Sequence, residues 1–222
     1  MKMAEEVIVA KVLVVGSLGS GKSCLLLRFV EQDFKPTTST TIGVDLRSKV
    51  VEVRGNKIRL QVWDTAGQEG FQSVARSYYK EAAAALIVYD TTSRASFAQL
   101  PKWLQAVREN AGNKELVITL VGTKTDMAEK RKVTREEGEA FARERNLLFV
   151  EVSSKTGEGV EMAFVSTASA IARKVDQGLF NLDDPTHGVK RAEKRTATAS
   201  SGLADASSLN QLPGTETGWC CT

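Results

Sequence analysis

The chain alternates between short apolar stretches and longer amphipathic ones. The apolar stretches predict strands at residues 11–16, 58–64, 85–90, 116–122 and 147–153. The amphipathic stretches predict helices at residues 22–32, 69–80, 94–110, 134–144 and 158–175. Continuous apolar strands that alternate with helices indicate a parallel sheet with helices on both faces.

One stretch, residues 47–55, instead alternates apolar and polar side chains, as a half-buried edge strand does. Gly55 and Asn56 predict a hairpin turn into the strand at 58–64, so these two strands are expected to pair antiparallel. The predicted fold class is therefore α/β, an open, mostly parallel sheet of six strands with one antiparallel edge strand. Such sheets bind ligands beyond the carboxyl ends of their strands.

The pattern fades near Gly178. Residues 178–222 are rich in Ala, Ser, Thr and Gly and contain few large apolar side chains, which is typical of a flexible tail. We therefore expect one domain at residues 1–177, followed by a C-terminal tail.

Composition and charge narrow the function classes. The 30 basic and 27 acidic residues nearly balance, and nucleic-acid binders carry a broad basic face, so no nucleic-acid partner is expected. No apolar run approaches the roughly 20 residues of a membrane span, and residues 1–11 lack the layout of a signal peptide. The three cysteines, Cys24, Cys220 and Cys221, suggest no disulfide framework, which fits the reducing cytosol.

Residues 16–23, GSLGSGKS, follow the first predicted strand and match the phosphate-loop pattern G-x-x-x-x-G-K-[ST] of P-loop NTPases. Glycines let backbone N–H groups converge on the phosphates, Lys22 adds a positive charge, and the Ser23 hydroxyl ligates Mg²⁺. Cys24 is expected to pack in the core, with only its backbone N–H near the nucleotide. The predicted phosphate-binding residues are Ser17, Leu18, Gly19, Ser20, Gly21, Lys22, Ser23 and Cys24.

The end of the predicted strand 58–64 carries the sequence DTAGQ. Asp64 is placed to hold Mg²⁺ through water, and the Gly67 amide to sense the γ-phosphate. Gln68 is placed to orient the attacking water and is the predicted catalytic residue. The sole histidine, His187, lies in the predicted tail, so no histidine base is expected in the folded part.

Two further loops predict recognition of the base. A carboxylate at Asp126, in GTKTD (122–126), can accept hydrogen bonds from N1–H and the 2-amino group of guanine, which adenine cannot match. A backbone N–H of VSSK (152–155) can donate to guanine O6. The predicted base-binding residues are Thr123, Lys124, Asp126, Ser153, Ser154 and Lys155.

Over about residues 8–177 these segments resemble the Ras-like small GTPases, and within them the Rab branch. The resemblance rests on the loops above together with TTIGVDL (40–46), WDTAGQEGF (63–71) and RSYYKEAAAALIVYDTT (76–92). It implies a GTPase that acts as a GTP/GDP molecular switch in vesicle-mediated membrane traffic.

By this resemblance Thr41 ligates Mg²⁺ together with Ser23 and Asp64, and closes over the γ-phosphate in a first switch. Phe34 packs on the edge of guanine, and a second switch runs from Asp64 to about Tyr79. The expected effector surface consists of Ile42, Leu46, Trp63 and Tyr78.

The resemblance also implies partners and a location. The expected monomer works with a guanine-nucleotide exchange factor, a GTPase-activating protein, a GDP-dissociation inhibitor or escort protein, and effectors. GKSCLL and SVARSYY favour the type-four Rabs of endosomal recycling, GEAFARERNLLF favours the type-two Rabs of Golgi and ER–Golgi traffic, and type fourteen is also similar. The expected location is the cytoplasmic face of endosomal or Golgi membranes, cycling with the cytosol.

Cys220 and Cys221, in the ending WCCT, resemble a double-geranylgeranylation signal, and two lipid chains give stable membrane attachment. Three positions depart from the family pattern. Thr123 replaces asparagine and is expected to alter local hydrogen bonding without loss of guanine specificity. Leu46 replaces phenylalanine and is expected to change the partner set, and Gly70 replaces arginine and is expected to loosen the second switch.

Leu18 stands where the family has a small residue. By resemblance its side chain faces the space where the γ-phosphate, the attacking water and an arginine finger meet, which predicts intact binding with slow hydrolysis. Alternatively, Leu18 lies flat against the second switch beside Gly70. Two other function classes remain: a GTP-binding scaffold that does not cycle, and a P-loop nucleotide kinase or ATPase, for which the sequence offers no acceptor-binding lid.

Overall fold

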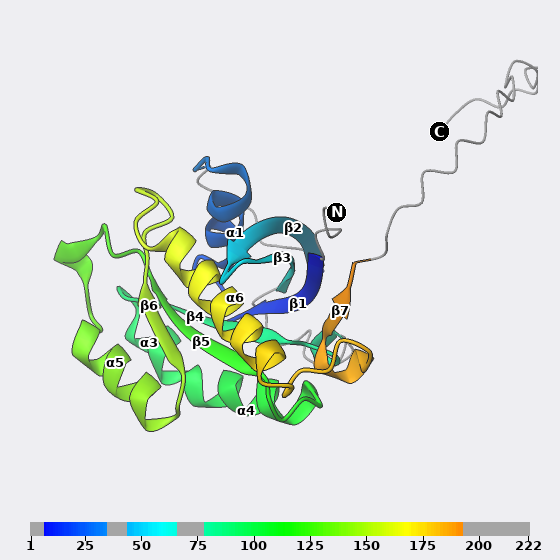
Figure 1. Cartoon of the computed structure of the whole chain (residues 1–222). Helices are drawn as coiled ribbons and strands as arrows, with labels where there is room; N and C mark the ends of the chain where they lie inside the picture. Colours follow the sequence, from blue (N-terminus) through cyan, green and yellow to red (C-terminus); the bar gives the residue numbers. More distant parts are fainter. Residues whose placement is uncertain (1–6, 35–43, 66–77, 193–222) are drawn as a thin grey trace, which may run out of the picture. The chain divides into compact units, whose positions relative to one another are not determined.

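A computed structural model describes residues 7–34, 44–65 and 78–192 (Figure 1). In this part of the chain one sheet has the order β2-β3-β1-β4-β5-β6, with β7 added on β1. The strands are β1 (Val7–Val15), β2 (Val44–Val53), β3 (Asn56–Thr65), β4 (Ala84–Asp90), β5 (Val117–Thr123), β6 (Leu148–Glu151) and β7 (Val189–Arg191).

The pairing confirms the predicted α/β fold. β2 pairs antiparallel with β3 through the turn at Gly55 and Asn56, and β3, β1, β4, β5 and β6 pair parallel along the sheet. β4 and β5 are buried along their whole lengths, as expected for continuous apolar strands covered on both faces.

Five helices in the described residues cover the sheet: α1 (Lys22–Glu31), α3 (Arg94–Ala98), α4 (Leu100–Asn110), α5 (Arg135–Glu144) and α6 (Val160–Asp176). α1 and α6 bury their apolar side chains in one core cluster, and α4 and α5 in a second, so the two groups lie on opposite faces of the sheet (Figure 1). Phe29 of α1 and Phe164 of α6 stack with ring centroids 3.8 Å apart.

The predicted helix at 94–110 is divided into α3 and α4 at Gln99. Pro101 has no N–H to donate to the Phe97 carbonyl, so the ladder of helical hydrogen bonds is interrupted there. Most of the predicted helix at 69–80 lies outside the described residues. None of the helices in the described ranges has the length and apolar character that crossing a bilayer requires.

The expected boundary at residue 177 is wrong, because the fold continues to Ala192. β7 pairs antiparallel with Ile8–Ala10 of β1, and it follows a short 3₁₀ helix at Pro185–His187. Phe180 and Val189 are buried, and Gly188 (φ 67°) lies so close to Ala83 that a Cβ would be 2.4 Å from its backbone nitrogen. The sheet therefore has seven strands in the described ranges, and residues 178–192 belong to the domain.

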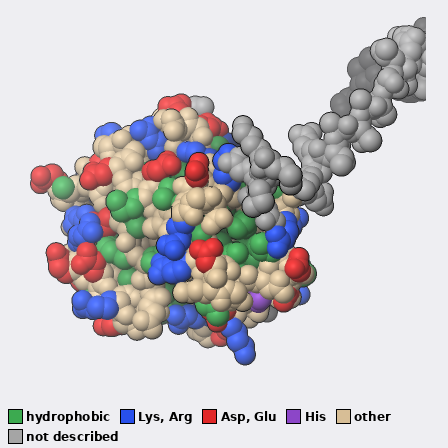
Figure 2. Space-filling view, viewed as in Figure 1, with side chains coloured by type: hydrophobic (Ala, Val, Ile, Leu, Met, Phe, Trp, Pro, Cys, Tyr) green, Lys and Arg blue, Asp and Glu red, His purple; other side chains and the backbone are tan. Residues whose placement is uncertain are grey.

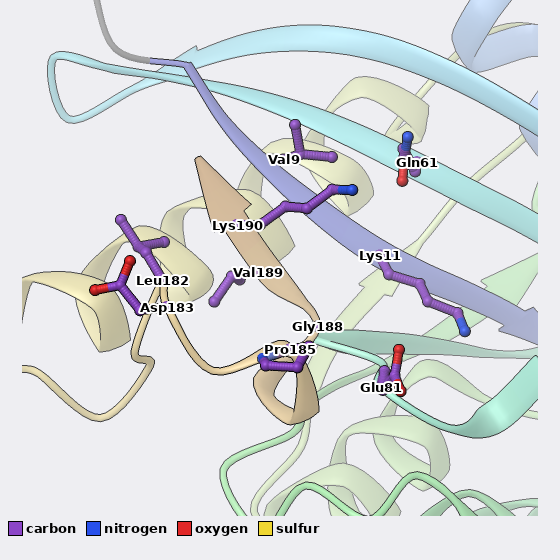
Figure 3. Close-up of a pocket in the computed structure, with 10 residues that line it drawn as sticks. All are labelled: Val9, Lys11, Gln61, Glu81, Leu182, Asp183, Pro185, Gly188, Val189 and Lys190. Atoms are coloured by element: carbon purple, nitrogen blue, oxygen red, sulfur yellow. The ribbon is translucent and has the colours of Figure 1, made fainter. Parts of the chain in front are cut away.

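A hollow of about 310 Å³ lies beside β7 and is lined in part by residues of β1 and β3. Figure 3 shows Val9 and Lys11 of β1, Gln61 of β3 and Lys190 of β7 around it, with Pro185 and Leu182 at its margin. It contains no residue of the predicted nucleotide site. In Figure 2, which views the molecule as Figure 1 does, basic and acidic side chains are interspersed over the face that is shown.

Candidate nucleotide-binding site

The loop between β1 and α1 has the shape that a phosphate cradle requires. Gly16 (φ 146°) passes so close to β4 that a Cβ would lie 2.2 Å from the Val88 carbonyl oxygen. Gly19 and Gly21 also have positive φ angles, 73° and 90°, which glycine adopts without strain. The chain then enters α1 at Lys22, so the backbone N–H groups of the loop and of the helix N-terminus converge on one place.

Lys22 lies under this loop and is buried. Its ammonium donates to the carbonyl oxygens of Gly16, at 2.9 Å, and Ser17, at 3.0 Å. Burial lowers the pKa of Lys22 to about 8, and the nearby Asp64 carboxylate counteracts this shift. An ammonium has three donors, so within the described contacts a third N–H remains for a phosphate oxygen. A bound phosphate would stabilise the charged form that burial disfavours.

Ser23 and Asp64 bring two oxygen ligands together at the mouth of the loop. The Ser23 hydroxyl donates to the Asp64 carboxylate, which β3 places beside Val14 of β1. Thr65 fixes this strand end, because its hydroxyl donates to the Val14 carbonyl at 2.9 Å. Hydroxyl and carboxylate oxygens are ligands that Mg²⁺ prefers, so the pair fits the predicted metal. This ion would neutralise phosphate charge when it binds with the nucleotide.

Several predicted residues of the switches fall outside the described residues: Thr41, Ile42, Gly67, Gln68 and Gly70. The same holds for the predicted prenylation residues, Cys220 and Cys221. Phe34, predicted to contact the base edge, is the last described residue before the first switch, and its N–H donates to the Asp33 side chain at 2.8 Å.

Leu18 and Cys24 differ in exposure. The Leu18 side chain is 58% exposed, which leaves it at the rim of the phosphate loop. Cys24 is half-buried on α1, although the expectation was core packing. Ser17 has a contact that the sequence did not indicate, because the indole N–H of Trp103 on α4 donates to its hydroxyl at 3.4 Å.

Thr123 connects the phosphate loop to the ends of β4 and β5. Its buried hydroxyl lies 2.6 Å from the Ser20 carbonyl oxygen and 3.0 Å from that of Tyr89, with one proton for both acceptors. Its side chain also contacts the position of Gly21, where a Cβ would lie 3.4 Å from the hydroxyl. The predicted change in local hydrogen bonding at Thr123 therefore concerns the phosphate loop as well as the base loop.

The two predicted base loops are joined to each other. The Ser153 hydroxyl donates to Asp126 at 2.7 Å and accepts from the Thr156 N–H at 3.1 Å. Asp126 itself is exposed, so its carboxylate is accessible to the N–H groups of a guanine ring. Ser154 is buried and Lys155 is exposed in the same loop.

Lys124 adopts a positive φ of 63°, and its ammonium lies 2.6 Å from the Asp90 carboxylate at the end of β4. This ion pair ties the first base loop to the end of β4.

A second ion pair, between Arg131 and Glu151, supports the base loops. Arg131 donates to both carboxylate oxygens of Glu151, at 2.6 and 3.1 Å, and to the Val133 carbonyl at 3.1 Å. It thereby ties the segment after Asp126 to the end of β6. Sequence reasoning missed this pair, because no local pattern indicates a contact across 20 positions.

The predicted effector residues of the described ranges lie together. Leu46 is paired with Trp63 across β2 and β3, and the Trp63 and Tyr78 rings lie 5.8 Å apart. Leu46 is 49% exposed, so this apolar patch, formed by Leu46, Trp63 and Tyr78, faces solvent. The Lys11 ammonium lies 5.1 Å from the Trp63 ring and also donates to the Lys80 carbonyl.

Comparison with known protein families adds one finding. The family model described as Ras family matches residues 11–173, most of the 222-residue chain. The match includes the phosphate loop, Asp64 and both base loops. It ends before β7, so the C-terminal strand lies outside the region that the family model covers.

Proposed function

This chain belongs to the Ras family, whose members are small GTPases that act as GTP/GDP switches, and on that premise we propose that it is a Rab-type switch of vesicle traffic. The family also implies guanine-nucleotide and Mg²⁺ binding, exchange factors, activating proteins and effectors. These properties disfavour the P-loop kinase or ATPase alternative. Endosomal recycling is the proposed pathway, and Golgi or ER–Golgi traffic is the alternative.

The apolar patch of Leu46, Trp63 and Tyr78 is the observation that carries the Rab proposal. Trp63 is the cross-strand neighbour of Leu46 and lies beside the Tyr78 ring, so the exposed Leu46 and the two half-buried rings form one surface beside the expected switches. A partner that reads the nucleotide state must touch such a surface, since hydrolysis changes only the segments around the γ-phosphate. Leu46 gives the patch an exposed aliphatic side chain, which favours partners other than those that read an aromatic ring at this position.

Attachment of two prenyl groups, at Cys220 and Cys221, is the expectation that distinguishes the Rab branch from small GTPases with a single prenylated cysteine. We expect the full chain, incubated with a Rab escort protein, geranylgeranyl transferase and geranylgeranyl diphosphate, to gain two prenyl groups by mass spectrometry. Variants with Cys220→Ser or Cys221→Ser should gain one, and the double variant none. A single prenyl group on the wild-type chain, or modification that does not require the escort protein, would contradict the proposal.

The proposed membrane compartment, recycling endosomes or the Golgi, can be tested independently of lipid attachment. Full-length chain in cells should co-fractionate with recycling endosomes on the cytoplasmic side, and it should move to the cytosol when a GDP-dissociation inhibitor is added. Co-fractionation with Golgi membranes would select the alternative pathway. The Cys220→Ser, Cys221→Ser double variant is the control for lipid dependence.

A slow switch follows from Leu18, which is 58% exposed at the rim of the phosphate loop. A side chain at this rim competes for space with an arginine finger, which contributes about 10³–10⁵ in rate. We propose that nucleotide binding is intact and stimulated hydrolysis is impaired. If hydrolysis is absent, the protein is a GTP-binding scaffold and not a slow switch. Single-turnover phosphate release, measured with and without a Rab-directed activating protein, separates the slow switch from the scaffold.

A further inference from the structure

Arg28, in the last turn of α1, divides its guanidinium between two carbonyl groups from distant segments. One Nη donates to the Gln32 carbonyl at 2.9 Å, and the other to the Thr156 carbonyl at 3.3 Å. Gln32 ends α1, with φ 57°, and its N–H donates back to the Arg28 carbonyl at 3.1 Å. Thr156 belongs to the loop after β6 that begins at Ser153. Arg28 therefore bridges the end of α1 and a base loop.

The loop after β6 leaves room for this guanidinium at Gly157. Gly157 has a φ of 88°, and a Cβ there would lie 2.7 Å from one Nη of Arg28 and 3.0 Å from its Nε. The guanidinium thus occupies the space that a side chain at position 157 would take. It packs against the backbone of the loop in addition to its hydrogen bond.

The same loop is closed on itself by Ser153. The Gly157 N–H donates to the Ser153 carbonyl at 2.8 Å, and the Thr156 N–H donates to the Ser153 hydroxyl. Ser153 in turn donates to Asp126. A displacement of Thr156 is therefore transmitted to the residue that holds the predicted guanine ligand, and to the neighbouring N–H groups of the loop.

The two ends of this loop are held differently. Glu151, at its β6 end, is 7% exposed and receives two hydrogen bonds from Arg131. Thr156, further along the loop, accepts a hydrogen bond at its backbone carbonyl from the Arg28 guanidinium. Buried bidentate pairs are stronger than a partly exposed hydrogen bond to a carbonyl, so Arg28 is the weaker and more adjustable of the two anchors.

We propose that Arg28 is a positioning residue for guanine recognition, a role that rests on the proposed GTPase function. It holds the loop at Ser153–Thr156 so that a backbone N–H reaches guanine O6. It also fixes the end of α1 at Gln32, two residues before Phe34. Loss of the fork releases both segments, so the nucleotide dissociates faster and the protein discriminates less well at O6.

The residue type follows from the geometry. A guanidinium donates to two carbonyl groups from one rigid plane, whereas a lysine ammonium at the end of a flexible chain lacks this fork. A hydrogen bond within the protein, formed in exchange for bonds to water, contributes about 0.5–1.5 kcal/mol, which corresponds to about two- to twelve-fold in dissociation rate. Arg28→Lys keeps the charge but is expected to behave like Arg28→Ala.

The test compares dissociation of GDP with that of 6-thioguanosine diphosphate from the full chain with Mg²⁺. The analogue keeps N1–H and the 2-amino group for Asp126 and replaces only O6 by sulfur, a weak acceptor. Arg28→Ala and Arg28→Lys should accelerate GDP release by about two- to twelve-fold. Release of the analogue should change by less than half as much, so the preference for GDP falls.

Arg94→Ala is the matched control, because Arg94 is an exposed arginine that pairs with Glu137 on α5, away from the site. It should leave both rates unchanged. Equal acceleration of both nucleotides by the Arg28 variants, or no acceleration, would overturn the positioning role; thermal unfolding of the same variants shows whether equal acceleration reflects loss of the fold. A wild-type chain that fails to retain GDP would contradict the proposed function itself.

Discussion

The phosphate end and the base end of the site are held by different means. At the phosphate end, glycine backbone, the buried Lys22 and the strand end at Asp64 fix the geometry. At the base end, Asp126 is exposed, and the loops depend on side-chain contacts between segments far apart in the chain. We expect the phosphate end to dominate affinity and hydrolysis, and the base end to determine which nucleotide is preferred, with a smaller contribution to affinity.

Thr123 is the point where the two ends meet. It begins the TKTD loop at the base end, yet its hydroxyl lies against the Ser20 carbonyl of the phosphate loop. A change there should disturb both properties, whereas a change on either side should disturb one. Substitutions at the phosphate end, at the base end and at Thr123 should therefore differ in which property they change.

The largest effect is expected at Leu18, on the phosphate end. Leu18→Ser should accelerate hydrolysis stimulated by a Rab-directed activating protein by at least about 100-fold, because it opens the space that an arginine finger needs. Single-turnover phosphate release measures the change. Leu179→Ser, which alters another exposed leucine outside the site, is the control. Unchanged rates in Leu18→Ser would show that the leucine does not obstruct catalysis.

Lys22 and Lys124 compare the same residue type at the two ends. Lys22→Ala should weaken GDP binding by roughly 100-fold, since it removes charge-assisted hydrogen bonds worth about 1.5–3 kcal/mol each. Lys124 is partly exposed and already paired with Asp90, so Lys124→Ala should cost about tenfold or less. Equilibrium titration with a fluorescent GDP analogue measures both. A larger loss of GDP affinity in Lys124→Ala than in Lys22→Ala would show that the base end, and not the phosphate end, dominates affinity.

Asp126→Asn tests specificity at the base end. An amide N–H can donate to the C2 carbonyl of xanthine, whereas the carboxylate accepts from the 2-amino group of guanine. The ratio of GDP to xanthosine diphosphate affinity should therefore fall by roughly 10- to 100-fold. The Mg²⁺ dependence of binding should not change, because Ser23 and Asp64 are untouched. Asp176→Asn, on α6, is the control, and an altered ratio in that variant would indicate a general charge effect.

The smallest effect is expected at the junction. Thr123→Val keeps the shape of the side chain but removes the hydroxyl that donates between the Ser20 and Tyr89 carbonyl groups. Unfolding free energy should fall by about 1–3 kcal/mol, the usual cost of a buried group without its partner. Denaturant unfolding measures this, and release of both GDP and its 6-thio analogue should accelerate together. A selective effect on one nucleotide would place Thr123 with the base end alone.

The phosphate end was predictable from the sequence because its information is local. Gly16, Gly21, Lys22 and Ser23 lie within eight consecutive positions, and the strand and helix around them have clear patterns. The strands and the hairpin at Gly55 could be predicted for the same reason.

The remaining contacts were not predictable, because they join positions that no periodicity relates. Arg131 and Glu151 are 20 positions apart, and Arg28 and Thr156 are 128 apart. β7 is three residues long, too short to show a period, and its partner lies at the other end of the chain. The averaged composition of residues 178–222 also concealed the buried side chains of Phe180 and Val189.

The pairing of β7 with β1 has a consequence for the order in which the chain folds during synthesis. Ile8–Ala10 leaves the ribosome long before Val189–Arg191 is made, so this part of β1 pairs with β3 alone until the residues of β7 emerge. Bringing such distant segments together also adds a slow, entropically costly step. The earlier strands and α6 can assemble first, and the closing of β7 then marks the moment at which the nascent chain becomes a complete domain.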